Sequence, residues 1–539
     1  MLGAAVLAQA PPAPSVQLPA IDYPAIAPML IVLGAACLSV LVEAFVAHPG
    51  RWAAQVGLTL ATLLAAGAAL GAHLYSFTGG VRDAVTLAAT VVVDGPTLFL
   101  WGTLLALGLA AALLIADRTV EPGGSFTADA AVRAGTAADR EINRAVRSQG
   151  YAGTATVSGM QTEVFPLLLF SLGGMMAFVA ANDLLTMFIA LEVLSLPLYL
   201  MCGLARRRRL LSQEAAVKYF LLGAFASAFF LYGVALLYGY AGSVKLSEIA
   251  EASGGSDRSD TLLFAGLALL VIGLLFKGSV GPFHAWTPDV YQGAPTPVTA
   301  FMAACTKVAA FGGILRVLTV AFGATQWEWR GVLWGVAIAS MVIGAVLGLT
   351  QTDIKRMIAY SSVAHAGFLL VGAIALTAAG LSGTMFYLLA YGFTTLAAFG
   401  VITLVRDAGG EASHLSQWAG LAKRSPLTAA VFAFLLFALA GIPLTSGFTG
   451  KFAVFSAAIA DGMAPLVVIA LVVSAVAAFF YLRVVVLMYF SEPAPDGPTV
   501  SVPGPFTTAA ITLGVMVTLL LGVLPTFALD WAALGVFAS

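Results

Sequence analysis

Six basic side chains of this 539-residue sequence lie inside long apolar runs, where a membrane would surround them with lipid. They are Lys218, Lys277, Lys307, Arg316, Lys451 and Arg483. A charge at the centre of a membrane helix costs about 2.5–3.5 kcal/mol on insertion scales, so each needs an explanation. A desolvated lysine gives up its proton more readily than an exposed one, which suits it to proton transfer. For Arg316 and Arg483 a simpler interpretation suffices, because a long side chain can reach the headgroups or a lipid phosphate.

Three of the lysines resist that simpler interpretation. Lys307 lies about eleven residues inside its apolar run, and reaching the surface would require roughly 15 Å at 1.5 Å per residue. Lys277 precedes the break "GSVGPFHAWTP", which contains Pro282, and Lys451 follows the break "GIPLTSGFTG", which contains Pro443. A broken helix at membrane depth is tolerated only where protein buries it or where it lines a watery cavity. We therefore expect these lysines to lie on hydrated proton paths.

Two further residues extend this set. Glu192 lies in the middle of the apolar run "LLTMFIALEVLSLPLYLMCGL", and a buried carboxylate must pair with a cation or take up a proton. Lys218 is the nearest candidate partner in the sequence, although Glu214, four residues before it, offers Lys218 an alternative partner one helical turn away. His365, in "YSSVAHAGFLL", is either a proton relay or a satisfied packing residue, and the sequence favours neither.

The composition identifies the surroundings of these residues as a membrane. Hydrophobic residues make up 60% of the chain, charged residues 9%, and the mean hydropathy is +0.98, whereas a soluble domain carries about 25% charged residues. The net charge of −1 argues against a nucleic-acid partner. Cys37, Cys202 and Cys305 have no metal-ligand spacing and no glycine-rich nucleotide fingerprint is present, so we expect no cofactor in this chain.

The sequence predicts an all-α integral membrane protein with about 14 transmembrane helices, since a span needs roughly 20 apolar residues. The predicted spans are 25–47, 53–77, 94–116, 163–181, 184–205, 214–240, 261–281, 296–322, 331–350, 356–378, 383–405, 426–460, 464–490 and 506–536. We interpret 1–24 as an N-terminal extension, because its apolar run is short and no basic residues precede it. Residues 117–162 form a polar insertion, whose part from Thr127 to Ser148 is suited to a surface helix. The insertion is either a contact for a neighbouring protein or a linker.

The positive charges of the loops predict the orientation of these helices. With the N-terminus outside, the inner loops carry 15 Lys and Arg residues and the outer loops carry 4. The excess of cations on the inner side is typical of membrane proteins. We therefore expect both termini outside and the insertion 117–162 on the inner side.

The two predicted helix breaks occupy equivalent places in the chain. The domains that we expect are 1–24, helices 1–3 (25–116), the insertion 117–162, helices 4–8 (163–322), helices 9–13 (331–490) and helix 14 (506–539). In both five-helix units the fourth helix is the broken one. Because five is odd, the two units enter the membrane from opposite faces, which is the pattern of an inverted repeat with a site near the midplane.

Four motifs resemble subunit N of the bacterial proton-pumping NADH-quinone oxidoreductase, respiratory complex I, whose mitochondrial counterpart is subunit 2. They are "FKGSVGPFHAWTPDVYQGAPTPV", "ALEVLSLPLYLMCGL", "KYFLLGAFASAFFLYG" and "GIPLTSGFTGKF". The resemblance is strong over 163–460, and the insertion 117–162 departs from the family pattern. It implies a multi-pass protein of the bacterial inner membrane and carries proton-path roles to Glu192, Lys218, Lys277, Lys307 and Lys451.

The resemblance also implies the function and the partners. The chain is expected to be a non-redox subunit of an NADH:quinone reductase, with NADH, FMN, iron–sulfur clusters and quinone held by other subunits. Its expected neighbours are subunit M and the small subunits K, J and A, within the lipid bilayer. A subunit of a sodium/proton antiporter or of a membrane-bound hydrogenase remains an alternative, and a passive membrane scaffold is a second one.

Overall fold

The computed structural model of this chain is built almost entirely of helices. The expected surface helix from Thr127 to Ser148 and most of the N-terminal extension lie outside the residues that the structure describes. The described residues are 21–78, 83–120, 125–126, 161–205, 208–254, 260–407, 410–494 and 497–538.

Three long helices and a short hairpin begin the described chain. They are α1 (Tyr23–Phe45), α2 (His48–Thr78), β1 (Ala84–Thr86), β2 (Val91–Val93) and α3 (Gly95–Ala116). The two strands pair in antiparallel fashion. Asp94 begins α3 because its carboxylate accepts the backbone N–H of Thr97.

The first predicted repeat contains a helix that ends inside the bundle. Its elements are α5 (Val164–Ala180), α6 (Leu184–Cys202), α7 (Arg209–Ala241), α8 (Leu246–Ser253), α9 (Asp260–Lys277), α10 (Trp286–Gly293), α11 (Thr296–Phe301), the π-helix η1 (Met302–Thr306), α12 (Lys307–Arg316) and the π-helix η2 (Val317–Ala321). Pro282 lies in the turn between α9 and α10, as expected for the first break. The π-helical turns on both sides of α12 have no counterpart in our sequence-based prediction.

The second predicted repeat contains the second break. Its elements are α13 (Gln326–Leu349), α14 (Ile354–Ile374), α15 (Ala378–Leu404), β3 (Val405–Asp407), β4 (Gly410–Glu411), the 3₁₀-helix η3 (Leu415–Trp418), α16 (Leu421–Arg424), α17 (Pro426–Ala440), α18 (Ser446–Ala460) and α19 (Ala464–Phe490). Pro443 lies in the turn between α17 and α18, so the predicted span 426–460 is two helices.

The chain then continues through β5 (Thr499–Val500), α20 (Pro505–Val523) and α21 (Thr526–Ala532). β5 joins β3 and β4 in a small antiparallel sheet. The predicted last span, 506–536, is too long, because the helix ends at Val523. Pro525 follows this end, and proline has no backbone N–H with which to continue a helix.

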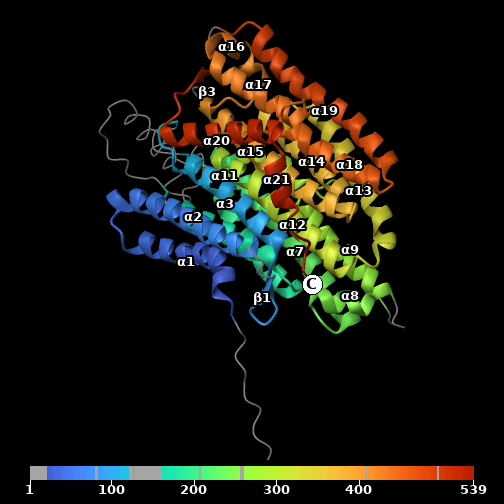
Figure 1. Cartoon of the computed structure of the whole chain (residues 1–539). Helices are drawn as coiled ribbons and strands as arrows, with labels where there is room; N and C mark the ends of the chain where they lie inside the picture. Colours follow the sequence, from blue (N-terminus) through green and yellow to red (C-terminus); the bar gives the residue numbers. More distant parts are fainter. Residues whose placement is uncertain are drawn as a thin grey trace, which may run out of the picture.

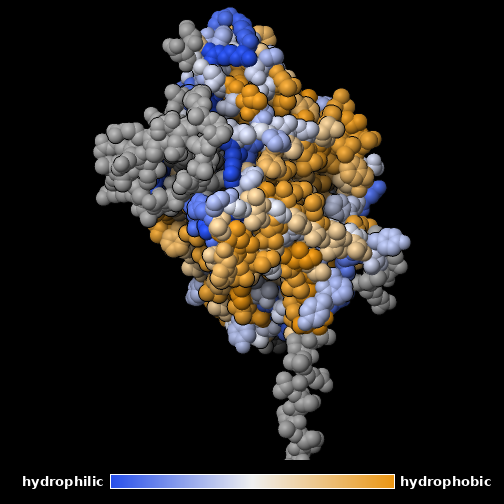
Figure 2. All heavy atoms as spheres, turned by 90° about the vertical axis from the view of Figure 1, so that its left-hand side faces the viewer, coloured by the Kyte–Doolittle hydropathy of each residue, from blue (hydrophilic) through white to orange (hydrophobic). Residues whose placement is uncertain are grey.

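Twelve helices of the described chain are long and apolar enough to cross a membrane, and α5 and α17 are shorter apolar helices. Every one of the fourteen predicted spans therefore contains a helix. The segment Thr296–Ala321 and α14 and α15 form the buried centre of the bundle. The outer helices carry exposed apolar side chains such as Phe45 and Phe225, and Figure 2 shows hydrophobic residues covering much of one face.

The two ends of the bundle carry different short elements. Figure 1 shows β3 and α16 at one end, and β1 and α8 at the other. Phe126, in the described part of the insertion, bridges to Ala205, and a small cavity lined by Ser125 and Ala205 is also lined by Arg406 and Glu411, from the hairpin of β3 and β4. Ser125 and Phe126 of the insertion therefore lie against the end of the bundle that bears β3.

Candidate functional site

Lys277 is the last residue of α9 and its side chain is buried, with 4% exposed. Its Nζ donates to Ser195 Oγ at 2.7 Å and to the Tyr219 hydroxyl at 3.1 Å. The rings of Tyr199 and Tyr219 lie 5.7 and 5.2 Å from the ammonium group. Glu192 precedes Ser195 by about one turn of α6. The first break therefore places an ammonium group among hydroxyls and aromatic faces.

Lys307 begins α12, directly after the π-helix η1, and 2% of it is exposed. Its Nζ donates to the carbonyl oxygen of Ser362 at 2.8 Å and to that of Gly278 at 3.3 Å. Gly278 is the residue after Lys277, so Lys307 binds the backbone directly beyond the end of α9. The Gly278 carbonyl is available to Lys307 because α9 ends at Lys277, and the carbonyls at the end of a helix have no partner within it.

Lys451, on α18, occupies the second break in a similar way and is 7% exposed. Its Nζ donates to the carbonyl oxygens of Ala440 at 2.9 Å and Leu439 at 3.3 Å, which end α17. It also donates to Ser474 Oγ of α19 at 2.9 Å. Gly441 has φ of 87°, and a Cβ there would lie 3.2 Å from Lys451 Nζ. A glycine at this position therefore allows both the turn and the approach of the lysine.

His365 lies on α14 between the two regions. Its Nδ1 and the Tyr387 hydroxyl are 2.6 Å apart, and its Nε2 and the Tyr481 hydroxyl are 3.3 Å apart. It follows Ser362, whose carbonyl oxygen binds Lys307, by one helical turn. Phe368, one turn further on, faces the Lys451 ammonium at 5.0 Å. One face of α14 therefore runs from Lys307 past His365 to Lys451.

Three buried hydroxyl groups lie close to one another beside Lys307. They belong to Ser362, Tyr391 and Thr395, and within the described part of the chain none of the three makes a direct hydrogen bond of good geometry. The Tyr391 ring lies 5.5 Å from Lys307 Nζ. An unsatisfied buried polar group costs about 1–3 kcal/mol, and buried water commonly satisfies such groups. This cluster is suited to hold water next to the lysine.

The expected pair between Glu192 and Lys218 is not formed in this structure. Lys218 Nζ lies 2.6 Å from a carboxylate oxygen of Glu214 and 2.7 Å from one of Asp289. The alternative pairing with Glu214 is therefore present, and Asp289, which no sequence pattern indicated, is a second partner. Glu192 Oε1 is buried and has no hydrogen-bond partner in the described chain.

The expectation that Arg316 reaches the headgroups is wrong. Arg316 is fully buried, and its Nη2 lies 3.1 Å from Asp94 Oδ1 and 2.7 Å from Thr97 Oγ1. The carboxylate satisfies the charge inside the protein, so the guanidinium does not need to reach lipid. Arg483 is exposed and donates to the carbonyl oxygen of Leu349 at 3.2 Å, as its predicted position at the surface requires.

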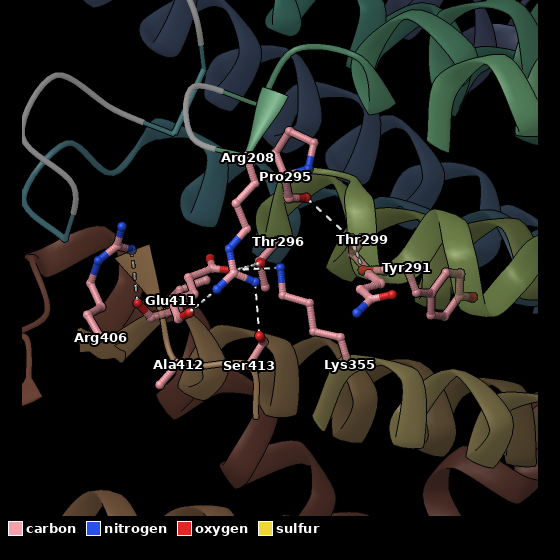
Figure 3. A network of polar contacts seen from close by, with 12 residues as sticks. Arg208, Tyr291, Pro295, Thr296, Thr299, Lys355, Arg406, Glu411, Ala412 and Ser413 are labelled. Atoms are coloured by element: carbon pink, nitrogen blue, oxygen red, sulfur yellow. Dashed lines mark hydrogen bonds and ion pairs between the residues drawn. The ribbon is translucent and has the colours of Figure 1, made fainter. Parts of the chain in front are cut away.

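A polar network joins several elements at the end of the bundle that bears β3. Lys355 Nζ lies 2.6 Å from Glu411 Oε2, which also accepts from Thr296 Oγ1 at 2.6 Å. Figure 3 shows Arg208 reaching Ser413 and the backbone of Glu411 from the opposite side. Burial alone would raise the pKa of the Glu411 carboxyl, but Lys355 and the Thr296 hydroxyl hold it below its usual value. This network fixes the start of α11 and α14 relative to each other.

The sequence did not reveal the hydroxyl groups that surround the lysines. Ser195, Tyr219, Tyr387, Tyr481 and Ser474 come from four helices distant in sequence from the breaks, and none differs from an ordinary helix residue by spacing or type. In the described ranges, no group of three or more His, Cys, Asp and Glu residues is arranged to hold a metal ion.

The chain is similar to proteins of the respiratory chain over nearly all its length. The sequence profile of the family described as "NADH:quinone oxidoreductase/Mrp antiporter, TM" matches residues 181–477. NADH-quinone oxidoreductase subunit N of Saccharopolyspora erythraea is 76% identical over 524 residues, 97% of this chain and 99% of the relative. The protein of the same name from Rhodococcus opacus is 58% identical over 98% of this chain and 97% of its own.

Solved structures agree with these relatives in fold. A chain of respiratory complex I from Thermus thermophilus with bound aureothin has a TM-score of 0.73 and 32% identity, covering 94% of this chain and 100% of its own. A chain of the Mrp complex from Dietzia sp. has a TM-score of 0.76 and 23% identity, covering 94% of this chain and 96% of its own. The second likeness is one of fold alone.

Proposed function

The chain belongs to the subunit N family of NADH-quinone oxidoreductase, and on this basis we propose that it moves protons across the membrane through its buried lysines. It is a membrane subunit of complex I, and electron transfer from NADH to quinone supplies the driving force. We assign the proton path to Glu192, Lys218, Lys277, Lys307 and Lys451, with His365 as a relay.

The contacts of the lysines with neutral groups support this assignment most directly. Lys277, Lys307 and Lys451 donate to hydroxyl and carbonyl oxygens, which accept a hydrogen bond from an ammonium group and also from a neutral amine. Each lysine can therefore release its proton without leaving a buried carboxylate unpaired. Moving one proton against the membrane potential costs about 2.3 kcal/mol per 100 mV. The pKa values of the transporting groups must therefore change by more than about one or two units during the cycle.

The direction of transfer follows from the proposed orientation. We assign both termini to the outside and the insertion 117–162 to the inner, cytoplasmic side of the bacterial inner membrane. Lys277 and Lys307 take protons from the inner side, and His365 passes them along α14 to Lys451, which delivers them outward. The opening and closing of an ion pair between Glu192 and Lys218 changes the charge balance at Lys277 and starts the transfer.

The remaining parts of the enzyme belong to other chains in this proposal. We assign NADH, FMN, the iron–sulfur clusters and quinone to other subunits, and we propose that this chain contacts subunit M and the small subunits K, J and A. Its share of the reaction is proton translocation without a redox step. The domains 25–116, 163–322, 331–490 and 506–539 then correspond to a first helix group, two inverted repeats and a final helix.

Replacement of Lys277 by methionine tests the proposal. NADH-driven acidification of inverted membrane vesicles and NADH-quinone turnover are both expected to fall at least about a hundredfold, the lower end of what a positioned proton-transfer group typically contributes. Assembly of the complex is measured by native gel electrophoresis. Lys245→Met is the matched control, because Lys245 lies outside the spans and forms its ion pair with Glu248, at 2.8 Å.

Two results would overturn the proposal in different ways. Normal pumping by assembled Lys277→Met complexes would make Lys277 structural and favour a passive scaffold. A dependence of the transported charge on sodium rather than on protons would favour an antiporter-like activity.

A further inference from the structure

Asp289 is a carboxylate that the proposed proton path does not use, and it binds two cations at once. Its Oδ2 lies 2.7 Å from Lys218 Nζ, and its Oδ1 lies 2.6 Å from Arg356 Nη1. Lys218 belongs to α7 in the first repeat, whereas Arg356 belongs to α14 in the second. One side chain therefore joins the two repeats by charge.

The short helix α10 carries this carboxylate between the repeats. α10 follows the first break and packs against both α7 and α14. Gln292, one turn after Asp289, accepts from Arg356 Nη1 at 3.1 Å and donates to Asp353 Oδ2 at 2.9 Å. Asp353 in turn caps the start of α14. The position of α10 is thus linked to the start of the helix that carries Ser362 and His365.

Lys218 binds two carboxylates that lie on different elements, Glu214 and Asp289. Glu214 moves with it, since both lie on α7 one turn apart and the Glu214 side chain is 55% exposed. Asp289 and Glu192 lie on other helices, α10 and α6, and Glu192 Oε1 has no hydrogen-bond partner among the described residues. The Lys218 side chain is 40% exposed, so packing leaves it room to adopt another rotamer when an ion pair opens.

We propose that Asp289 is a positioning residue, which holds Lys218 away from Glu192 in this state and couples the release of Lys218 to α14. This inference rests on the proposed function, because Asp289 competes with Glu192 for Lys218 in the ion pair proposed there. When Lys218 turns to Glu192, Asp289 keeps Arg356 as its remaining cation and pulls on the first turn of α14. Arg356 thereby removes the cost of a stranded carboxylate, which would otherwise oppose the change.

Asp289→Asn and Glu214→Gln form a matched pair of tests, because both remove a carboxylate that lies about equally close to Lys218. We expect acidification of inverted vesicles by Asp289→Asn complexes to slow about fivefold, which corresponds to roughly 1 kcal/mol. Glu214→Gln complexes are expected to pump normally. Asp289→Glu keeps the carboxylate on a side chain that is one methylene longer, and these complexes are expected to pump faster than Asp289→Asn complexes. A role of Asp289 in packing alone would not predict this difference.

Arg356→Gln provides a second test that does not alter α10. With Arg356 removed, Asp289 retains Lys218 as its only cation, so the exchange to Glu192 is expected to slow as well. The double variant Asp289→Asn with Arg356→Gln is expected to lose less than the sum of the two single losses, because the two residues act through one contact. This variant pair remains informative if Asp289→Asn complexes assemble poorly.

The outcomes separate this inference from the proposed function. Normal pumping by assembled Asp289→Asn complexes, or an equal loss in Glu214→Gln complexes, would overturn the role of Asp289. If Lys277→Met complexes lose pumping in the same assay, the proton path stands without it. If neither Lys277→Met nor Asp289→Asn alters pumping, both proposals are wrong.

Discussion

The buried cations of this chain fall into two kinds according to the groups that they contact. Lys277, Lys307 and Lys451 donate to neutral oxygens, and among the described residues none of the three forms an ion pair. Arg316 is equally buried but pairs with Asp94. A lysine with neutral acceptors can lose its proton at small electrostatic cost, whereas a guanidinium beside a carboxylate stays charged. We therefore regard Arg316 as structural.

Removal of Arg316 is expected to destabilise the protein strongly. Arg316→Met leaves Asp94 buried without a cation, and breaking a buried pair in this way typically costs about 3–5 kcal/mol. The amount of assembled complex and its thermal unfolding midpoint measure the loss. The exposed Arg483 is the control, and Arg483→Met is expected to leave both unchanged.

A second replacement makes this prediction specific. Asparagine at position 94 keeps the N-cap of α3 but removes the charge. The double variant Arg316→Met with Asp94→Asn should therefore recover most of the lost stability. A double variant that is as unstable as Arg316→Met alone would show that the guanidinium acts through packing.

At the scale of the elements, each break brings a lysine to the end of a helix. In the second break this depends on the close approach of α17 and α18. A Cβ at Gly447 would lie 1.9 Å from the carbonyl oxygen of Ala438, so any other residue would force the two helices apart.

Gly447→Ala tests this arrangement. Separation of α17 and α18 should remove Lys451 from the carbonyl oxygens of Leu439 and Ala440, at an overpacking cost of about 1–3 kcal/mol. We expect both vesicle acidification and NADH-quinone turnover to fall. Gly335→Ala in α13 is the control, because nothing lies within 4 Å of a Cβ there; equal pumping by the two variants would contradict the proposed role of the break.

The breaks were predictable from sequence, and the π-helices beside Lys307 were not. Glycine and proline disrupt a helix through their own backbones, so Pro282 and Pro443 marked the breaks directly. The π-helix Met302–Thr306 contains no such residue, and packing around it must stabilise the wider turn. The pairs of Arg316 with Asp94 and of Lys218 with Asp289 join residues 222 and 71 positions apart. A single sequence does not specify which helices become neighbours at those distances.

At the scale of the whole molecule, the order of the helices was the best predicted property. Apolar length and loop charge depend only on transfer from water to lipid, and they act on each segment separately. The predicted last span is too long because the separate helix α21 contains large apolar side chains, such as Phe527 and Trp531, and so continues the apolar run of α20. Burial distinguishes the central helices from the peripheral ones, and hydropathy alone does not.

Cysteine labelling across α13 tests the proposed orientation. Glu328 lies in the first turn of α13 and Thr352 lies just beyond its other end, and both are exposed. In a Cys37→Ala background, Thr352→Cys should react with a membrane-impermeant maleimide in inverted vesicles only, and Glu328→Cys in right-side-out vesicles only. The reverse pattern would invert the assignment of inner and outer loops and the direction of transfer.

Lys307 and Lys451 bind main-chain oxygens, and this determines which mutations can inactivate the protein. Every amino acid supplies a carbonyl, so substitutions of Gly278, Ser362, Leu439 or Ala440 leave the acceptor in place. A genetic screen would then find the lysines themselves as sites of inactivating mutations, with few suppressors that exchange a partner. Lys218 differs, because its acceptors are carboxylate side chains that a compensating mutation can create or remove.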